Sequence, residues 1–162
     1  MVIQTKNLTL TLQSTEEVLA YIDSLSPADQ AEVSPDWLAR VRSSTAADPW
    51  THGFSMVEQV RGAVVGSCAY KGPPDQDGAV EIAYGVDAEY QGRGYATEAA
   101  RALVDFAFQS RQVHLVRAHT RPENGASTKV LAKCGFERVG EVIDPEDGLV
   151  WRWEVCPGPS TS

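Results

Sequence analysis

The stretch Glu89-Tyr90-Gln91-Gly92-Arg93-Gly94-Tyr95-Ala96-Thr97-Glu98 lies between a strand-like segment and the clearest helical pattern of the chain. Its two glycines let the backbone approach a ligand and adopt positive φ angles. The first turn of a helix adds unpaired N–H groups and the positive end of the helix dipole. The stretch therefore predicts a pocket for a phosphate or pyrophosphate, in which Arg93 supplies a guanidinium suited to phosphate oxygens. A glycine turn that begins a helix and binds nothing is the alternative.

Two other phosphate-binding motifs do not fit this stretch. A Rossmann fingerprint requires a third small residue at the position of Thr97 and an acid at the end of the next strand. That strand ends with His119 and Thr120, so the acid is missing. A P-loop requires Gly-Lys-Ser/Thr after four spacer residues, and the sequence around the two glycines does not supply it.

The segments on either side predict one α/β layered domain with a mixed sheet over residues 1–156. Ser14 and Glu17 have the spacing of a capping box, and Ser34-Pro35-Asp36 is a second helix start. The clearest helices are expected over 95–109 and 124–133, the second ended by Gly135. In the first, an apolar stripe is formed by Ala96, Ala99, Ala100, Leu103, Val104 and Ala107. The expected strands cover residues 7–13, 54–60, 63–70, 79–86, 113–120, 136–143 and 149–155. Residues 157–162 are expected to be a disordered tail.

Composition excludes several classes of protein. The chain has 162 residues, a formal net charge of −8 and 43% apolar residues. The acidic balance argues against a nucleic-acid partner, and no apolar run or signal sequence indicates a membrane or secretion, so the cytoplasm is expected. The three cysteines predict neither a disulfide framework nor a CxxC metal site. The three histidines lack the spacing of metal ligands, so no metal is expected.

Two blocks of the sequence together resemble the GNAT superfamily. Gln91-Gly92-Arg93-Gly94-Tyr95-Ala96 is similar to its motif Gln/Arg-x-x-Gly-x-Gly/Ala. About thirty residues further on, Asn124-Gly125-Ala126-Ser127 and the closing Gly135-Phe136 are similar to its Asn-x-x-Ser helix and Gly-Phe turn. The resemblance is strong over about residues 79–140, loose before residue 53, and closest to the branch that contains ribosomal-protein N-terminal acetyltransferases.

The resemblance implies a mostly antiparallel sheet of about seven strands, splayed between the fourth and fifth and flanked by about four helices. It also implies acetyl-CoA as cosubstrate. Backbone amides of residues 92–97 would hold the pyrophosphate, and the pantetheine arm would pair with the strand at 79–86, where Gly85 permits close approach. The cofactor-binding residues expected on this basis are Tyr84, Gly85, Val86, Gln91, Gly92, Arg93, Gly94, Tyr95, Ala96, Thr97 and Asn124.

The activity implied is N-acyl transfer by direct attack of a primary amine in a ternary complex. The amine must lose a proton, and Glu81 is the candidate base, although it could be a structural carboxylate. Glu98 is expected to be a helix-start acid. The sequence has Leu131 where many members carry a tyrosine that protonates the leaving thiolate. Ser127 is the candidate substitute; otherwise the thiolate leaves unassisted or takes a proton from water.

The acceptor remains open between a small-molecule amine, a peptide N-terminus and a lysine. Its pocket is expected from residues about 14–52, which carry no readable motif. Whether the donor is an acetyl or a longer or acidic acyl group is equally open. A non-catalytic module that senses acyl-CoA is the alternative function. A homodimer that pairs through the apolar final strand is a further hypothesis.

Overall fold

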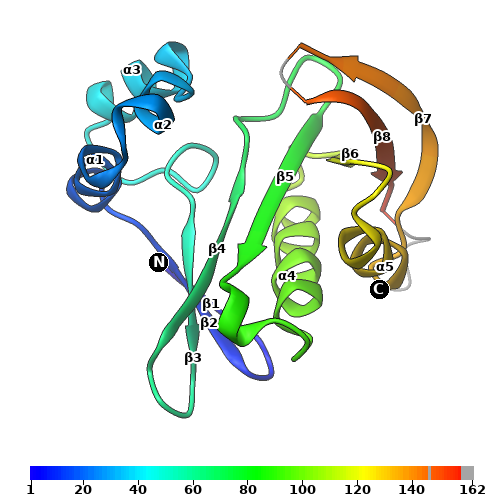
Figure 1. Cartoon of the computed structure of the whole chain (residues 1–162), viewed down its shortest axis with the longest axis horizontal. Coiled ribbons are helices and arrows are strands. Elements are labelled where there is room, and N and C mark those ends of the chain that lie inside the picture. Colours follow the sequence, from blue (N-terminus) through cyan, green and yellow to red (C-terminus); the bar gives the residue numbers. More distant parts are fainter. Residues whose placement is uncertain (146, 158–162) are drawn as a thin grey trace.

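The computed structural model describes residues 1–145 and 147–157, which form a mixed sheet flanked by helices (Figure 1). Most of the predicted tail, residues 158–162, lies outside the described residues. The strands are β1 (Val2–Gln4), β2 (Leu8–Leu12), β3 (Phe54–Glu58), β4 (Val64–Tyr70), β5 (Ala79–Val86), β6 (Leu115–Thr120), β7 (Glu137–Asp144) and β8 (Gly148–Val155). The helices are α1 (Thr15–Ser24), α2 (Pro27–Ala31), α3 (Pro35–Ser43), α4 (Tyr95–Gln109), α5 (Gly125–Lys133) and the 3-10 turn η1 (Ala88–Tyr90).

The sheet has the order β1-β2-β3-β4-β5-β6-β8-β7 and is antiparallel at every junction except one. Strands β5 and β6 are parallel, and they pair only where Ala79–Glu81 lies beside Leu115–Arg117. Beyond Glu81 the two strands diverge, so the edge of β5 that faces β6 has unpaired backbone groups. The expected splay is confirmed. The splay lies between the fifth and sixth strands instead of the fourth and fifth, because the short strand β1 adds one strand at the N-terminal end of the count.

Local sequence signals account for most of the elements. The capping box of Ser14 and Glu17 is present at the start of α1, and Ser34 caps α3 with Pro35 in its first turn. Gly62, with φ of 70°, closes the β3–β4 hairpin. Strand β1 and helix α2 were not predicted, because three residues are too few for a periodic pattern and α2 has no buried face.

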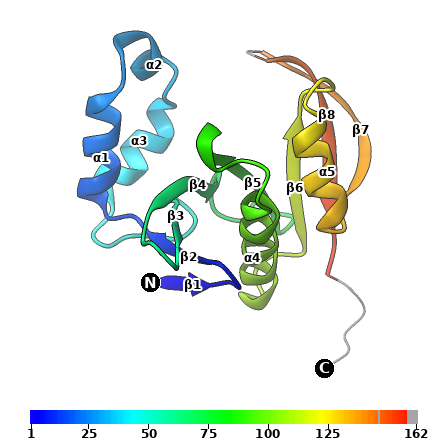
Figure 2. The same cartoon turned by 60° about the horizontal axis from the view of Figure 1, so that its bottom comes forward.

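The core lies between the sheet and helix α4, which packs against β5 and β2. The apolar stripe of α4 is buried as expected, and it consists of Ala99, Ala100, Leu103, Val104 and Ala107. A separate small cluster joins α1 to α3 through Val18, Ile22 and Val41. Figure 2 shows α1, α2 and α3 grouped together, apart from α4 and α5.

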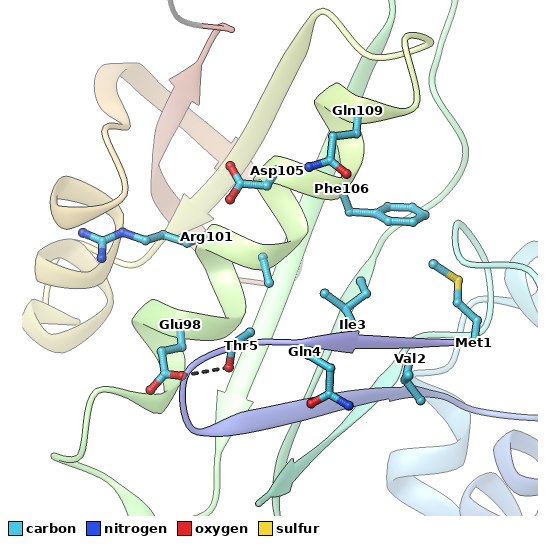
Figure 3. Close-up of a pocket in the computed structure, with 11 residues that line it drawn as sticks. Met1, Val2, Ile3, Gln4, Thr5, Glu98, Arg101, Asp105, Phe106 and Gln109 are labelled. Carbon is cyan, nitrogen blue, oxygen red and sulfur yellow. Dashed lines mark hydrogen bonds between the residues drawn. The ribbon is translucent and has the colours of Figure 1, made fainter. Parts of the chain in front are cut away.

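Glu98, in the first turn of α4, ties this helix to the turn between β1 and β2 (Figure 3). Its carboxylate accepts hydrogen bonds from the Thr5 hydroxyl and from the backbone and side-chain amides of Asn7, each 2.8 Å long. Burial tends to raise the pKa of Glu98, but these hydrogen bonds outweigh it and hold the pKa below its ordinary value. The predicted helix-start acid therefore also anchors the N-terminal hairpin.

The final strand does not have the free edge that a dimer through it would require. Strand β8 lies between β6 and β7 and pairs with both. The strand at this edge of the sheet is β7 instead. The prediction that the final strand pairs across a dimer is therefore wrong, because the last hairpin folds back to insert β8 inside the sheet.

Candidate active site

The glycine loop forms a turn whose backbone amides have no helical partner. Gly92 and Gly94 have φ of 80° and 82°, a conformation that favours glycine. Gly94 is the N-cap of α4 and provides no side-chain cap. The first hydrogen bond of α4 runs from the Glu98 amide to the Gly94 carbonyl, so the amides of residues 95–97 precede the helical ladder. The loop thus has the geometry of an anion site at a helix N-terminus.

A cavity of about 490 Å³, here called the glycine-loop cavity, lies between this loop, the end of β5 and one face of α5. Ten of the eleven predicted cofactor residues line it: Tyr84, Gly85, Val86, Gln91, Gly92, Gly94, Tyr95, Ala96, Thr97 and Asn124. A Cβ added at Gly85, Gly92 or Gly94 would meet no protein atom within 4 Å, so the backbone at all three is open to a ligand.

Arg93 is the exception among the predicted cofactor residues. Its guanidinium lies over the ring of Tyr90, 5.7 Å from the ring centre, and it does not line the glycine-loop cavity. Lys129 and Lys133 of α5 line the cavity instead. They stand one turn apart on the helix, a spacing that is common on exposed helices. Sequence reasoning missed them because only the packing of α5 beside the loop turns this face toward the cavity.

The start of α5 is held by the residues that the second motif contains. Asn124 is the N-cap, and its side-chain oxygen accepts a hydrogen bond of 3.1 Å from the Ser127 amide. The end of the helix has Gly135 with φ of 85°, as the sequence predicts. Leu131, which replaces the tyrosine of the family pattern, is fully buried in the core. Its side chain therefore packs in the core and does not line the glycine-loop cavity.

A tyrosine of β5, Tyr84, brings its hydroxyl group to α5 at Ser127. The hydroxyl groups of Tyr84 and Ser127 are 3.2 Å apart, within hydrogen-bond distance. Burial raises the pKa of the Tyr84 phenol by more than the hydrogen bond with Ser127 lowers it. The phenol therefore stays protonated at neutral pH and can donate a proton. Sequence reasoning placed Tyr84 only at the cofactor backbone, because nothing in a strand pattern shows which helix its ring meets.

A second cavity of about 660 Å³, here called the hairpin cavity, lies between β5, β6 and the β7–β8 hairpin. Glu81 and His119 line it, together with residues from the hairpin such as Val142, Ile143 and Arg152. Three residues line both cavities, and they are Tyr84, Asn124 and Ser127. The two cavities therefore meet at the splay between β5 and β6, beside the hydroxyl pair of Tyr84 and Ser127.

Glu81 lies in the hairpin cavity within a small polar network. Its Oε2 atom is 2.9 Å from Lys71 Nζ and 3.0 Å from His119 Nδ1. Burial favours a raised pKa for Glu81, but the hydrogen bonds from Lys71 and His119 outweigh it and keep the pKa below its ordinary value. Glu81 is therefore an ionised carboxylate at neutral pH. The geometry fits a structural carboxylate, because Glu81 is paired with Lys71 and His119. It also fits a general base, because Glu81 lines the cavity.

His119 connects Glu81 to the last strand. Arg152 of β8, directly opposite His119 in the register, donates from Nε to His119 Nε2 over 3.2 Å. Because Nε2 accepts this bond, the ring proton is assigned to Nδ1, which donates to Glu81. Neither His119 nor Arg152 was predicted as a site residue. Their juxtaposition depends on β8 pairing with β6, which the sequence pattern does not reveal.

Other features of the described residues lie apart from these two cavities. A cavity of about 570 Å³ beside β1 and α4, drawn in Figure 3, contains none of the predicted site residues. Within residues 1–145 and 147–157, no cluster of three or more His, Cys, Asp or Glu side chains has the geometry of a metal site. The three cysteines are free. In the same residues, each helix is too short or too polar to cross a bilayer.

Comparisons with known proteins agree with this geometry. A family model described as an acetyltransferase (GNAT) domain matches residues 5–137. The uncharacterized N-acetyltransferase p20 of Bacillus licheniformis is 26% identical over 133 residues, covering 82% of this chain and 74% of that protein.

Two solved structures share the fold. Ribosomal-protein-S5-alanine acetyltransferase from Vibrio fischeri has a TM-score of 0.73 at 18% identity, covering 96% of each chain. Mycobacterium smegmatis RimJ in complex with CoA-disulfide has a TM-score of 0.64 at 23% identity, covering 92% of this chain and 81% of that one. The expected likeness to ribosomal-protein acetyltransferases is confirmed. Because the family model spans most of the sequence, this chain belongs to the GNAT family of acetyltransferases.

Proposed function

We propose that this N-acetyltransferase holds acetyl-CoA in the glycine-loop cavity and the acceptor amine in the hairpin cavity, and joins them in a ternary complex. This acceptor site differs from the one expected from the sequence, because none of residues 14–52 lines the hairpin cavity. The observation that carries the proposal is the sharing of Tyr84, Asn124 and Ser127 by the two cavities. A donor and an acceptor that enter from opposite sides of the splay can therefore meet without a covalent enzyme intermediate. Holding both in one site supplies much of the rate enhancement.

The residues of the glycine-loop cavity fit the cofactor. The amides of residues 92–97 suit the pyrophosphate, and the exposed ammonium groups of Lys129 and Lys133 add positive charge beside it. The unpaired edge of β5 near Gly85 suits the amide groups of the pantetheine arm. Bound acetyl-CoA would supply the thioester carbonyl that the amine attacks and the thiol that leaves.

Glu81 is proposed to remove the proton of the acceptor amine, directly or through water. It is ionised, it lines the hairpin cavity, and only one of its two oxygens takes part in the contacts with Lys71 and His119. Its lowered pKa makes it a weak base, so the proton transfer requires an acceptor held close to the free oxygen. Lys71 and His119 keep the carboxylate in place.

Ser127 is proposed to take part in protonating the leaving thiolate, together with Tyr84. The phenol of Tyr84 is the donor, since burial keeps it protonated, and Ser127 orients it through their hydrogen bond. This arrangement supplies from β5 the hydroxyl that the family pattern expects from α5. It also explains how Leu131 can be a core residue without loss of the proton donor.

Turnover separates this function from a non-catalytic acyl-CoA sensor. The protein is mixed with acetyl-CoA and a panel of amines, and free thiol is followed. Thiol release that depends on both protein and amine supports the transferase. Tight binding of CoA without thiol release for any amine favours the sensor. Repeating the assay with succinyl-CoA tests the acyl preference. A cytoplasmic location, a homodimer and the lack of a nucleic-acid partner stay predictions.

A further inference from the structure

Two salt bridges join four of the six Asp, Glu, Lys and Arg residues that line the hairpin cavity. Lys71 is paired with Glu81, and Arg121 lies 2.7 Å from Asp147. Asp144 accepts a hydrogen bond from the Asp147 amide. Arg152 of β8 also lines the cavity, and it takes part in none of the salt bridges of the described residues.

The terminal nitrogens of the Arg152 guanidinium make no hydrogen bond among the described residues, where its one bond is from Nε. Its Nε atom donates to His119 Nε2, but a neutral imidazole does not balance a positive charge. Across the described part of the chain, the one buried side-chain nitrogen or oxygen without a partner is Arg40 Nε. The terminal nitrogens of Arg152 are therefore accessible, and the residue itself lines the hairpin cavity.

The position of this guanidinium is set by three strands. Glu81 on β5 accepts from His119 on β6, and His119 accepts from Arg152 on β8. Each link is a hydrogen bond of 3.0–3.2 Å. A side chain held in this way loses little further freedom when it binds a ligand. The network thus holds a planar fork of N–H donors at the wall of the hairpin cavity, where the acceptor amine is proposed to bind.

We propose that Arg152 binds a carboxylate of the acceptor, so that the acceptor class is an amine that carries a carboxylate on the same molecule. The proposal rests on the acetyltransferase function above and specifies the chemical class of the acceptor substrate. A guanidinium matches a carboxylate through two parallel hydrogen bonds. Free amino acids and peptides with an acidic residue near the N-terminus both satisfy this chemistry.

Matched acceptors test the proposal. Glycine is compared with glycinamide, and the amidated peptide Ala-Glu-Ala with Ala-Gln-Ala. Each pair is compared at equal concentrations of unprotonated amine, because the amine pKa values differ. We expect the carboxylate member of at least one pair to have a kcat/KM about tenfold or more higher, in line with the strength of charge-assisted hydrogen bonds. The pair that shows the preference identifies the source of the carboxylate. Equal values in both pairs would overturn the proposal.

The variant Arg152→Gln should reduce that preference to about one, because the amide has no charge for a carboxylate. Arg138→Gln is the matched control. Arg138 lies on the neighbouring strand β7, stacks on Trp151 with its guanidinium 4.3 Å from the ring centre, and does not line the cavity. The role of Arg152 would be contradicted if Arg152→Gln kept the preference for the carboxylate acceptor. It would also be contradicted if Arg138→Gln removed that preference equally.

A binding experiment keeps this inference separate from the acetyltransferase function. In the presence of CoA, the protein is titrated with N-acetylglycine or N-acetylglycinamide and with the N-acetylated forms of the two peptides. The side-chain ¹⁵N signals of His119 are followed. We expect the carboxylate compounds to bind more tightly and to shift His119 Nε2, because Arg152 is its hydrogen-bond partner. Equal binding of the carboxylate and amide compounds would overturn the proposal even in a protein that acetylates amines. Selective binding without turnover would support Arg152 and count against the proposed enzyme.

Discussion

The two halves of the proposed site offer their ligands different kinds of contact. The glycine-loop cavity presents main-chain amides from one continuous turn, with glycines where the backbone must be open. The hairpin cavity presents side chains from β5, β6, β8 and the loops between them. Recognition by backbone requires a particular local sequence, whereas recognition by side chains requires only that distant segments meet. The first half can therefore be read as a motif and the second cannot.

The largest effect is expected from Gly94→Val, which tests the backbone half. A valine side chain would occupy the open space at the start of α4 and force its φ of 82° on a β-branched residue. We expect CoA binding to weaken about a thousandfold, since several charge-assisted hydrogen bonds would be lost. Isothermal titration with CoA measures it.

Gly62→Val is the control for backbone strain. Gly62 has φ of 70°, lies in the β3–β4 hairpin, and likewise has no atom within 4 Å of an added Cβ. Both variants should lose about 1–3 kcal/mol of stability from the strained backbone. Only Gly94→Val should lose affinity for CoA. Unchanged affinity in Gly94→Val would remove the loop from the binding site.

Leu131→Ala asks whether the position of the missing tyrosine belongs to the core or to the chemistry. Leu131 is fully buried, so its truncation should cost about 3 kcal/mol of unfolding free energy. For a domain of this size the melting temperature should fall by about 6–12 °C. The rate per folded molecule should stay close to that of the wild type. A large loss of kcat with a normal melting temperature would show that this position acts in catalysis.

Glu81→Gln tests the side-chain half through its pH dependence. Because the pKa of Glu81 lies below its ordinary value, the carboxylate is ionised throughout the neutral range. Its loss should matter most where the amine arrives protonated. We therefore expect kcat/KM to fall about a hundredfold below the acceptor's pKa, and by less above it.

Glu154→Gln is the matched control for Glu81. Glu154 also pairs with a cation, Arg117, and its side chain is 22% exposed against 23% for Glu81. It lines neither cavity. Glu81 would have a structural role if Glu81→Gln kept the pH–rate profile of the wild type. The same conclusion would follow if Glu81→Gln and Glu154→Gln altered the profile equally.

The smallest effect is expected at the junction of the two halves. Tyr84→Phe and Ser127→Ala each remove one hydroxyl of the pair, and we expect kcat to fall about tenfold in either variant. The double variant should lose little more than the worse single one, because both hydroxyls act in one proton transfer. Thr128→Ala, the next residue on α5, should change kcat little. Additive losses would separate the roles of Tyr84 and Ser127.

The sequence predicted the elements whose signals are local. The capping box of α1, the buried stripe of α4 and the glycine that ends α5 each depend on neighbours within a few residues. The same is true of the glycine loop, which is why ten of eleven predicted cofactor residues line one cavity. Arg93 does not line the cavity, because its long side chain stacks on Tyr90 and the backbone conformation of the loop does not fix that contact.

The sequence by itself determined the family, the splayed sheet and the glycine loop proposed for the cofactor, since a phosphate-binding turn needs specific residues at consecutive positions. Tertiary structure alone decided that β8 inserts beside β6, which brings Arg152 to His119 and Glu81. It also decided that Tyr84 meets Ser127 across the splay. These contacts join residues 33 to 43 positions apart. Strand order and helix packing set such contacts, and no local pattern encodes them.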